Sequence, residues 1–183
     1  MACPEAVDIS MDNHRLQIRP DLGSATLMYA YCRWTAEGLL SKIFANHPGM
    51  TPFQFLSWNN SAGVSAVGCY ADEELVGVGW ICQVHQVADK KVAEVGVGFF
   101  KGTKLSLWRR GLALLIESAF LDHGCASVYG VCPAPNRAAR ALVLSAGMRE
   151  TGRIPLFTQW EGKAVDAIIC SLTKGEFYEQ RAQ

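Results

Sequence analysis

Residues 92–120, VAEVGVGFFKGTKLSLWRRGLALLIESAF, contain the two patterns that decide the fold of this chain. The first part, 92–100, is a β-rich run with glycine at positions 96 and 98, and glycine inside a strand indicates close approach of a ligand or another backbone, or else a packing kink. From Leu105 to Phe120 the apolar residues recur at steps of three and four, the period of an amphipathic helix. The stretch therefore predicts a strand, a short loop and a long helix.

A second strand and helix follow in the same order. The run SVYGVC at 127–132 predicts a short strand, and Asn136 is placed to cap a helix that ends near Gly147. Two further strands are predicted at 148–154 and 164–172. Because strand, helix and strand in succession need a crossover connection, at least one pair of strands is parallel. Ligands in such sheets lie near the carboxyl ends of adjacent parallel strands.

The N-terminal half predicts helices and an antiparallel hairpin. A helical pattern covers 24–44 and is interrupted near Arg33 or Gly38, and Thr51-Pro52 is typical of a helix start, here of a short helix toward Trp58. The strands expected here are 14–19, 64–70 and 75–82, the last two joined by the acidic turn 71–74. The polar tail, 174–183, is expected to fray. The prediction is an α/β fold with a mixed, mostly antiparallel sheet and helices on both faces.

Composition limits the classes of protein. Hydrophobic residues make up 50% of the 183 residues and charged residues 19%, which is enough apolar surface for one folded domain spanning 1–183. Seventeen Lys and Arg balance seventeen Asp and Glu, so the electrostatic footprint of a protein that grips phosphate backbones is missing. A nucleic-acid partner is therefore not expected.

Cysteine usage and hydropathy bear on the compartment. Seven scattered cysteines without a C-x-x-C pair argue against a disulfide framework and a zinc site, so we expect no metal and a reducing, cytoplasmic environment. The start of the chain lacks a basic segment followed by an apolar run, and no segment approaches the length of a spanning helix. Neither export nor a membrane association is expected.

The chain resembles the GCN5-related N-acetyltransferase (GNAT) superfamily in segments that follow the family's order. These are AEVGVGFF (93–100), ESAF (117–120), VYGVCPAPN (128–136), NRAARALVLSAGM (136–148) and VDAIICSL (165–172). Asn136 and Ala139 followed by Gly147-Met148 are similar to the family's asparagine, small residue and Gly-Phe pattern, and Gly152 fits the branch that acetylates ribosomal proteins. The resemblance implies a sheet of six to seven strands with a splayed parallel central pair.

The resemblance also implies acetyl-CoA as co-substrate. The pantetheine arm would lie against the strand at 94–100, and the pyrophosphate would bind amides of the next loop and helix start, where unpaired N–H groups form an anion site. The donor-binding residues implied in this way are Gly98, Phe99, Phe100, Lys101, Gly102, Thr103, Lys104, Ser106 and Asn136.

The pyrophosphate loop departs from the family pattern, which begins with Gln or Arg and has small residues at its fourth and sixth positions. Lys101, Lys104 and Ser106 occupy these positions. The side chain of Lys104 either crowds the pyrophosphate or binds it through its ammonium group, and a register that uses Gly102 changes the assignment.

Transfer of an acyl group from a thioester to an amine needs a neutral amine and a polarised carbonyl. The resemblance implies Glu94 as the base, acting directly or through a water, because it begins the strand where the family often places a carboxylate facing the acceptor. The alternative is a solvated residue at a strand edge. His85 is the second candidate, with an intrinsic pKa suited to proton transfer. The positions of the family's acid hold Val143 and Ala139, which cannot donate a proton.

Other residues are candidates for the same chemistry. Tyr129 and Ser145 are alternative proton donors, and Cys132 is either a nucleophile or, as we expect, a small buried hydrophobe. Trp58 is a candidate for an apolar acceptor site, together with Phe53 and Phe55. The arginines that could meet donor phosphates are Arg109, Arg110, Arg137 and Arg140.

The function predicted is an N-acyltransferase that moves an acetyl or other acyl group from acyl-CoA to a primary amine of unspecified class. The alternatives are a non-catalytic interaction module on the same fold and, third, a base-modifying enzyme acting on nucleic acid. A homodimer that pairs through the final strand is a further prediction.

Overall fold

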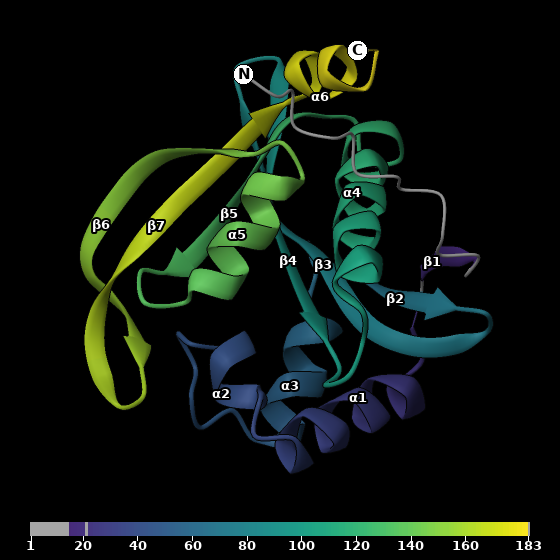
Figure 1. Ribbon diagram of the computed structural model, residues 1–183, viewed down its shortest axis with the longest axis vertical. Coiled ribbons are helices and arrows are strands. Elements are labelled where there is room, and N and C mark those ends of the chain that lie inside the picture. The colour runs from purple at the N-terminus through teal and green to yellow at the C-terminus, as the bar shows by residue number, and fades with distance from the viewer. Residues whose placement is uncertain (1–14, 21, 183) are drawn as a thin grey trace, which may run out of the picture.

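The computed structural model describes residues 15–20 and 22–182, and its elements are shown in Figure 1. His14, part of the first predicted strand, lies outside the described residues. The elements in chain order are β1 (Leu16–Pro20), α1 (Ser24–Ala36), α2 (Leu40–Ile43), α3 (Pro52–Asn59), β2 (Ser65–Ala71), β3 (Glu74–Val87), β4 (Lys90–Phe99), α4 (Leu105–Leu121), β5 (Cys125–Pro133), α5 (Arg137–Ser145), β6 (Arg149–Trp160), β7 (Lys163–Thr173) and α6 (Lys174–Arg181).

The strands of the described residues form one seven-stranded sheet in the order β1-β2-β3-β4-β5-β7-β6. Only β4 and β5 are parallel among the pairings of this sheet. Their pairing runs from Lys91 opposite Cys125 to Glu94 opposite Tyr129 and stops there, although both strands continue. The mixed sheet and the splayed parallel central pair are therefore confirmed.

Helices cover both faces of the sheet, as predicted (Figure 1). The apolar stripe of α4 and residues of α5 pack against one face, where Val95 and Phe99 of β4 meet Leu112 and Leu115. Helices α1 and α3 cover the other face around Trp34, with the small α2 beside them. Because successive side chains of a strand point to opposite faces, Val95 and Phe99 face α4 while Gly98 between them faces Trp34 and Ile43.

Local sequence signals explain the start and end of several elements. Gly38 has a φ of +68°, in the left-handed region that suits glycine, and it separates α1 from α2 at one of the two predicted positions. The hydroxyl of Thr51 accepts a hydrogen bond from the Gln54 amide and the Gln54 side chain accepts one from the Thr51 amide, a capping box at the start of α3. Asp72 and Glu73 form the two-residue turn between β2 and β3, both with positive φ.

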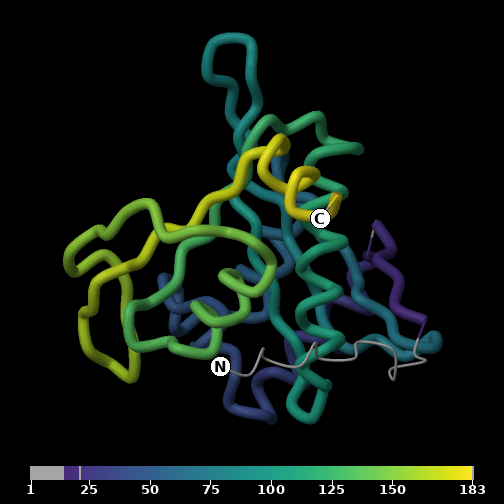
Figure 2. Tube along the Cα trace, turned by 45° about the horizontal axis from the view of Figure 1, so that its top comes forward, coloured from purple at the N-terminus to yellow at the C-terminus, as the bar shows by residue number. Residues whose placement is uncertain are grey.

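The β3–β4 hairpin is longer than predicted. β3 continues past Cys82 to Val87, with an irregularity between Cys82 and His85, and it turns into β4 at Lys90. Figure 2 shows this hairpin projecting beyond the rest of the molecule. The prediction that His85 follows the strand is wrong, since His85 pairs with Val92 inside it. A projecting hairpin has no buried face, so its sequence lacks the alternation that marks a strand.

The final strand is not an edge of the sheet. β7 pairs with β5 on one side and with β6 on the other, and the sheet ends at β1 and β6. A dimer paired through β7 is therefore excluded by this topology. β6 precedes β7 in the chain but lies outside it in the sheet, so β7 is flanked by β5 and β6. The sequence pattern predicts both strands but does not specify their order in the sheet.

The C-terminal tail, predicted to fray, forms the helix α6. Thr173 and Glu176 make a capping box at its start. Phe177 is 3% exposed and its ring lies edge-on to Phe120 of α4, with the ring centroids 5.4 Å apart. The side-chain Nε2 of Gln180 also donates a hydrogen bond to the Gly147 carbonyl, at 3.3 Å. The polar composition of the tail did not indicate that one buried residue, Phe177, packs the helix against the core.

Candidate active site

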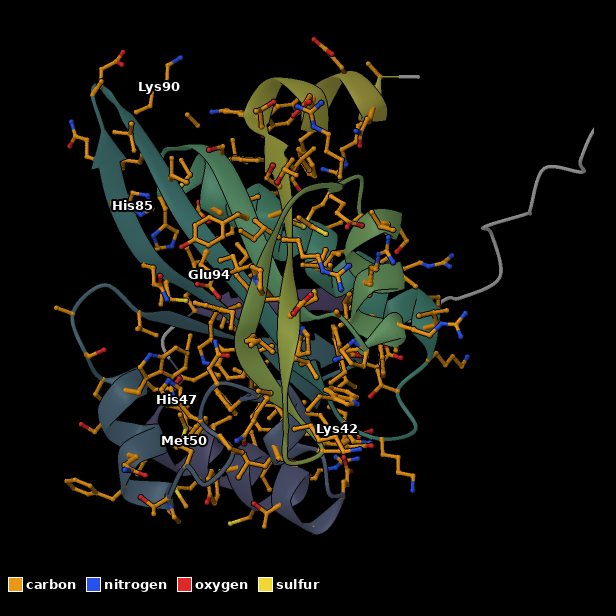
Figure 3. The ribbon with its side chains drawn as sticks, turned by 90° about the vertical axis from the view of Figure 1, so that its left-hand side faces the viewer. Lys42, His47, Met50, His85, Lys90 and Glu94 are labelled. Atoms are coloured by element: carbon orange, nitrogen blue, oxygen red, sulfur yellow. The ribbon has the colours of Figure 1, made fainter. Side chains whose placement is uncertain are left out.

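The gap between the diverging strands opens into a cavity of about 650 Å³. One part of the cavity is lined by residues of α4 and α5. The other part is lined by α2, by the loop that follows it and by the C-terminal end of β6. Figure 3 shows Glu94 between the projecting hairpin with His85 and the helical side with His47 and Lys42. The cavity therefore passes through the sheet and connects its two faces, a geometry in which two substrates can meet.

The predicted donor residues fall into two groups. Gly98, Phe99 and Asn136 line the cavity, whereas Lys101, Gly102, Thr103, Lys104 and Ser106 lie beyond the end of β4 and are not part of its lining. Gly98 is also packed closely, because a Cβ there would lie 2.8 Å from Ile43 Cδ1 and 3.0 Å from a ring carbon of Trp34. Gly98 and Phe99 are therefore the two predicted donor residues of β4 that line the cavity.

Phe100 differs from its predicted place. Its side chain is fully buried on the α1 face, against Trp34, and the Arg33 guanidinium lies 4.2 Å from its ring centroid. Its amide donates to the Val76 carbonyl and its carbonyl accepts from the Thr103 amide. Phe100 thus anchors the end of β4, and neither its ring nor these main-chain groups face the cavity.

The loop after β4 is held by specific contacts. The Lys101 amide donates to the Glu37 carboxylate at 2.7 Å, and the other Glu37 oxygen accepts from Arg33 Nε at 3.0 Å. Gly102 has a φ of +88°, which only glycine adopts readily, and the Thr103 hydroxyl donates to the Val76 carbonyl. A carboxylate therefore occupies the first amide of the predicted pyrophosphate loop, a contact that the sequence did not reveal.

Asn136 has the predicted capping role. Its Oδ1 accepts a hydrogen bond from the Ala139 amide at 3.1 Å, at the first turn of α5. It also lies in the cavity wall with Arg137. Of the other candidate arginines, Arg140 pairs with Glu150 at 2.6 Å, and Arg109 and Arg110 are exposed outside the cavity wall. A contact of Asn136 with the donor stays a prediction.

Glu94 is the titratable group at the point where the strands diverge. Its side chain is half-buried, and burial raises the pKa of its carboxyl, while a hydrogen-bonding interaction with Tyr129 opposes the shift. Tyr129 lies opposite Glu94 in the β4–β5 register, and its hydroxyl donates to Gln83 Oε1 at 3.2 Å. Burial and the neighbouring carboxylate raise the pKa of Tyr129 to about 12. Glu94 is therefore not a plain solvated residue at a strand edge.

The remaining catalytic candidates differ in burial and in their distance from the cavity. His85 is exposed on the hairpin, its ring 6.5 Å from that of Tyr129, and it does not line the cavity. Cys132 does line it, but burial raises the pKa of its thiol to about 12, so the small buried hydrophobe is confirmed. Val143 and Ala139 line the cavity without a proton to donate, and Ser145 lies outside the lining.

Three predicted aromatic residues of α3 have different places. Phe55 is fully buried, Phe53 is 79% exposed to solvent, and Trp58 lines the cavity. Trp80 of β3 lies beside Trp58 with a centroid separation of 5.8 Å, and its ring nitrogen donates to Asn59 Oδ1 at 2.7 Å. The acceptor-lining role is therefore open to Trp58 alone of the three.

Two lining residues were missed from the sequence. Trp160, at the end of β6, and Lys42, of α2, face each other, with the Lys42 ammonium 5.9 Å from the Trp160 ring centroid. They are 118 positions apart in the chain. No local pattern links them, because their contact depends on how the β6–β7 hairpin curves back over the cavity.

Comparison with known proteins identifies the fold. No protein-family model and no curated protein sequence matches the chain. Among solved structures, spermidine N-acetyltransferase from Vibrio cholerae, in complex with CoA and spermine, has a TM-score of 0.75 at 12% identity, covering 89% of this chain and 98% of its own. RimJ from Mycobacterium smegmatis, in complex with CoA-disulfide, has a TM-score of 0.74 at 16% identity, covering 88% and 83%.

A third structure belongs to the branch that the sequence resembles. Ribosomal-protein-S5-alanine acetyltransferase from Vibrio fischeri has a TM-score of 0.70 at 14% identity, covering 93% of this chain and 99% of its own. The fold of this chain is that of the GNAT acetyltransferases, as predicted. Within the described residues, no helix has the length and apolarity needed to span a bilayer, and no group of three or more His, Cys, Asp or Glu could hold a metal.

Proposed function

We propose that this protein is an N-acetyltransferase that takes an acyl group from acetyl-CoA, or a related acyl-CoA, and transfers it to a primary amine. The observation that carries the proposal is the cavity between β4 and β5, which joins the α4–α5 side of the sheet to the side of Glu94. The neighbours of the same fold from Vibrio cholerae and Mycobacterium smegmatis hold CoA or its disulfide, which supports the donor.

The residues present fit a pantetheine arm. From Val95 to Phe99 strand β4 has no partner on the β5 side, and alternate residues of a strand direct their N–H and C=O groups to that side. Backbone amides near Gly98 are thus placed to polarise a thioester carbonyl. The wall opposite is small and apolar, with Ala138 and Ala139 of α5.

Glu94 supplies the proton acceptor in this proposal. The amine nitrogen attacks the thioester carbonyl carbon, the C–N bond forms, the C–S bond breaks, and the electron pair leaves with sulfur as a CoA thiolate. Glu94 takes the proton that the amine nitrogen loses, directly or through a water, and the thiolate is protonated from solvent. Tyr129 keeps its own proton near neutral pH and acts on Glu94.

The non-catalytic alternative is favoured by one observation, the Glu37 carboxylate on the first amide of the loop. Two measurements separate the hypotheses. Titration calorimetry with acetyl-CoA should give saturable binding, and a panel of primary amines should release CoA thiol with acetylated amine as product. Binding without any product supports the interaction module, and absence of binding at millimolar acetyl-CoA contradicts the transferase.

Glu37 gives a specific prediction about donor affinity. Glu37→Gln keeps the size of the side chain and an oxygen that accepts from the Lys101 amide, but removes a negative charge beside the loop. Two like charges about 8 Å apart in water repel by about 0.5 kcal/mol, so the Kd for acetyl-CoA should fall about twofold. The gain should shrink in high salt. A Kd that rises would show that the charged carboxylate organises the loop.

A further inference from the structure

The acceptor side of the cavity carries little negative charge. Of the described residues that line the cavity, Glu94 is the one carboxylate, whereas Lys42 and Arg137 are cations. Arg137 begins α5 on the donor side, so Lys42 is the fixed charge at the far end of the acceptor side. Figure 3 shows Lys42 well apart from Glu94, on the helical side of the molecule.

The wall between these two charges is aromatic. Trp58 and Trp160 are half-buried lining residues, so each leaves part of its ring to the cavity. Phe44 and Trp80, which also line the cavity, pack against Trp58 at centroid separations of 5.8 Å each, and the Trp80 ring nitrogen donates a hydrogen bond to Asn59 of α3. Because these neighbouring rings hold Trp58 in place, it presents a rigid apolar surface, and burying that surface under an apolar ligand is favourable.

We propose that the acceptor is a monoamine with one aromatic-sized apolar group, and that polyamines are rejected. This deepens the proposed function and depends on it. The single amine would lie at Glu94, where its nitrogen bonds to the acetyl carbon as the C–S bond breaks and its proton passes to the carboxylate. The apolar group would lie along Trp58 and Trp160.

Charge decides against a polyamine. A spermidine bound with one nitrogen at Glu94 extends its other ammonium groups toward Lys42. There they face the positive charge of the lysine, and no carboxylate among the described lining residues is present to pair with them. Moving a charged group out of water needs an opposite charge or hydrogen bonds to compensate. The Vibrio cholerae neighbour is a spermidine N-acetyltransferase, so the fold itself admits polyamines and the discrimination rests on this chain's lining.

Competing substrates test the class. We expect kcat/KM for acetylation of 2-phenylethylamine to exceed that of spermidine at least tenfold, measured by release of CoA thiol and by mass of the product. A hexapeptide with N-terminal phenylalanine, assayed alongside, tells whether the aromatic amine is that of a small molecule or of a peptide. Preference for either aromatic amine supports the inference, and preference for spermidine overturns it.

Two variants locate the discrimination. Trp58→Ala should lower kcat/KM for 2-phenylethylamine about tenfold while the Kd for acetyl-CoA stays unchanged, and Phe53→Ala, a 79% exposed aromatic of the same helix, should leave both unchanged. Lys42→Glu should raise kcat/KM for spermidine relative to 2-phenylethylamine severalfold. Equal loss in both α3 variants, or an unchanged ratio in Lys42→Glu, contradicts the assignment.

The failure of the inference is distinct from failure of the proposed function. If acetyl-CoA binds and an amine other than an aromatic monoamine is acetylated fastest, the acceptor class is wrong and the transferase stands. If no amine in the panel, aromatic or not, is acetylated, the transferase itself is wrong.

Discussion

Replacing Glu94 with glutamine is expected to lower kcat for acetyl transfer at neutral pH by about a hundredfold or more, the usual size of a lost general base. Glutamine keeps the size of the side chain and a hydrogen-bonding group for Tyr129, but it cannot accept the proton of the amine. The rate of CoA-thiol release at saturating donor measures the effect. Glu179→Gln, at an exposed position of α6 outside the cavity, is the matched control and should stay within twofold.

The pH profile tells a base from a positioning group. Burial raises the pKa of Glu94, so the acidic limb of kcat/KM should lie above the range of an ordinary glutamate. Tyr129→Phe removes the interaction that lowers this pKa, and it should move the limb to higher pH. Glu94→Gln should lose the limb, and its deficit should shrink at alkaline pH as more free amine is present. A glutamine variant with the wild-type limb contradicts the base role.

The same burial predicts the effect on folding. Because the pKa of Glu94 is higher in the folded state than in the unfolded chain, the folded state binds more protons between the two values. Stability contributed by this group therefore falls as the pH rises through that window. Glu94→Gln avoids the burial of a charge and should be at least as stable as the wild type at neutral pH, so its lost activity would not come from unfolding.

Phe177→Ala is expected to reduce the free energy of unfolding by about 3–5 kcal/mol, the range for a buried phenylalanine. The ring is 3% exposed, lies in the core with Phe120 and holds α6 against the sheet. Because a small domain is stable by only about 5–15 kcal/mol, this one change threatens the fold. Equilibrium unfolding in urea, monitored by tryptophan fluorescence, gives the value.

A matched change shows whether the anchor is specific. Leu121→Ala, beside Phe120 but 60% exposed, should cost less than about 1 kcal/mol. Thr173→Ala removes the cap of α6 and should cost about 1 kcal/mol. If Phe177→Ala costs no more than Leu121→Ala, α6 is not part of the cooperative core.

Local signals in the sequence predicted most elements and some site residues. The period of the apolar residues in α4, the Thr51 cap and the asparagine cap of α5 each depend on a few neighbouring residues, so they are visible in one chain. Glu94 differs, since the family resemblance and not a local signal implied it, and the structure puts it where the strands diverge.

Site residues that depend on distant contacts were missed or misplaced. Phe100 shares a face with Glu94 at the period of two, and that face turns toward α1 beyond the cavity. Glu37 reaches the Lys101 amide only because the end of α1 lies beside the end of β4. The position of Tyr129 opposite Glu94 follows from the parallel register, which no short segment specifies.

The sequence by itself determined the order of helices and strands, the need for one parallel pair, and the presence of a carboxylate on the central strand. Only the tertiary structure decided that β7 is enclosed by β6, that α6 docks through Phe177, and that Lys42 and Trp160 close one end of the cavity. The physical reason is range. Periodicity and caps arise from hydrogen bonds and side chains within a few residues, whereas strand order and cavity walls arise from apolar surfaces that meet only when distant segments pack together.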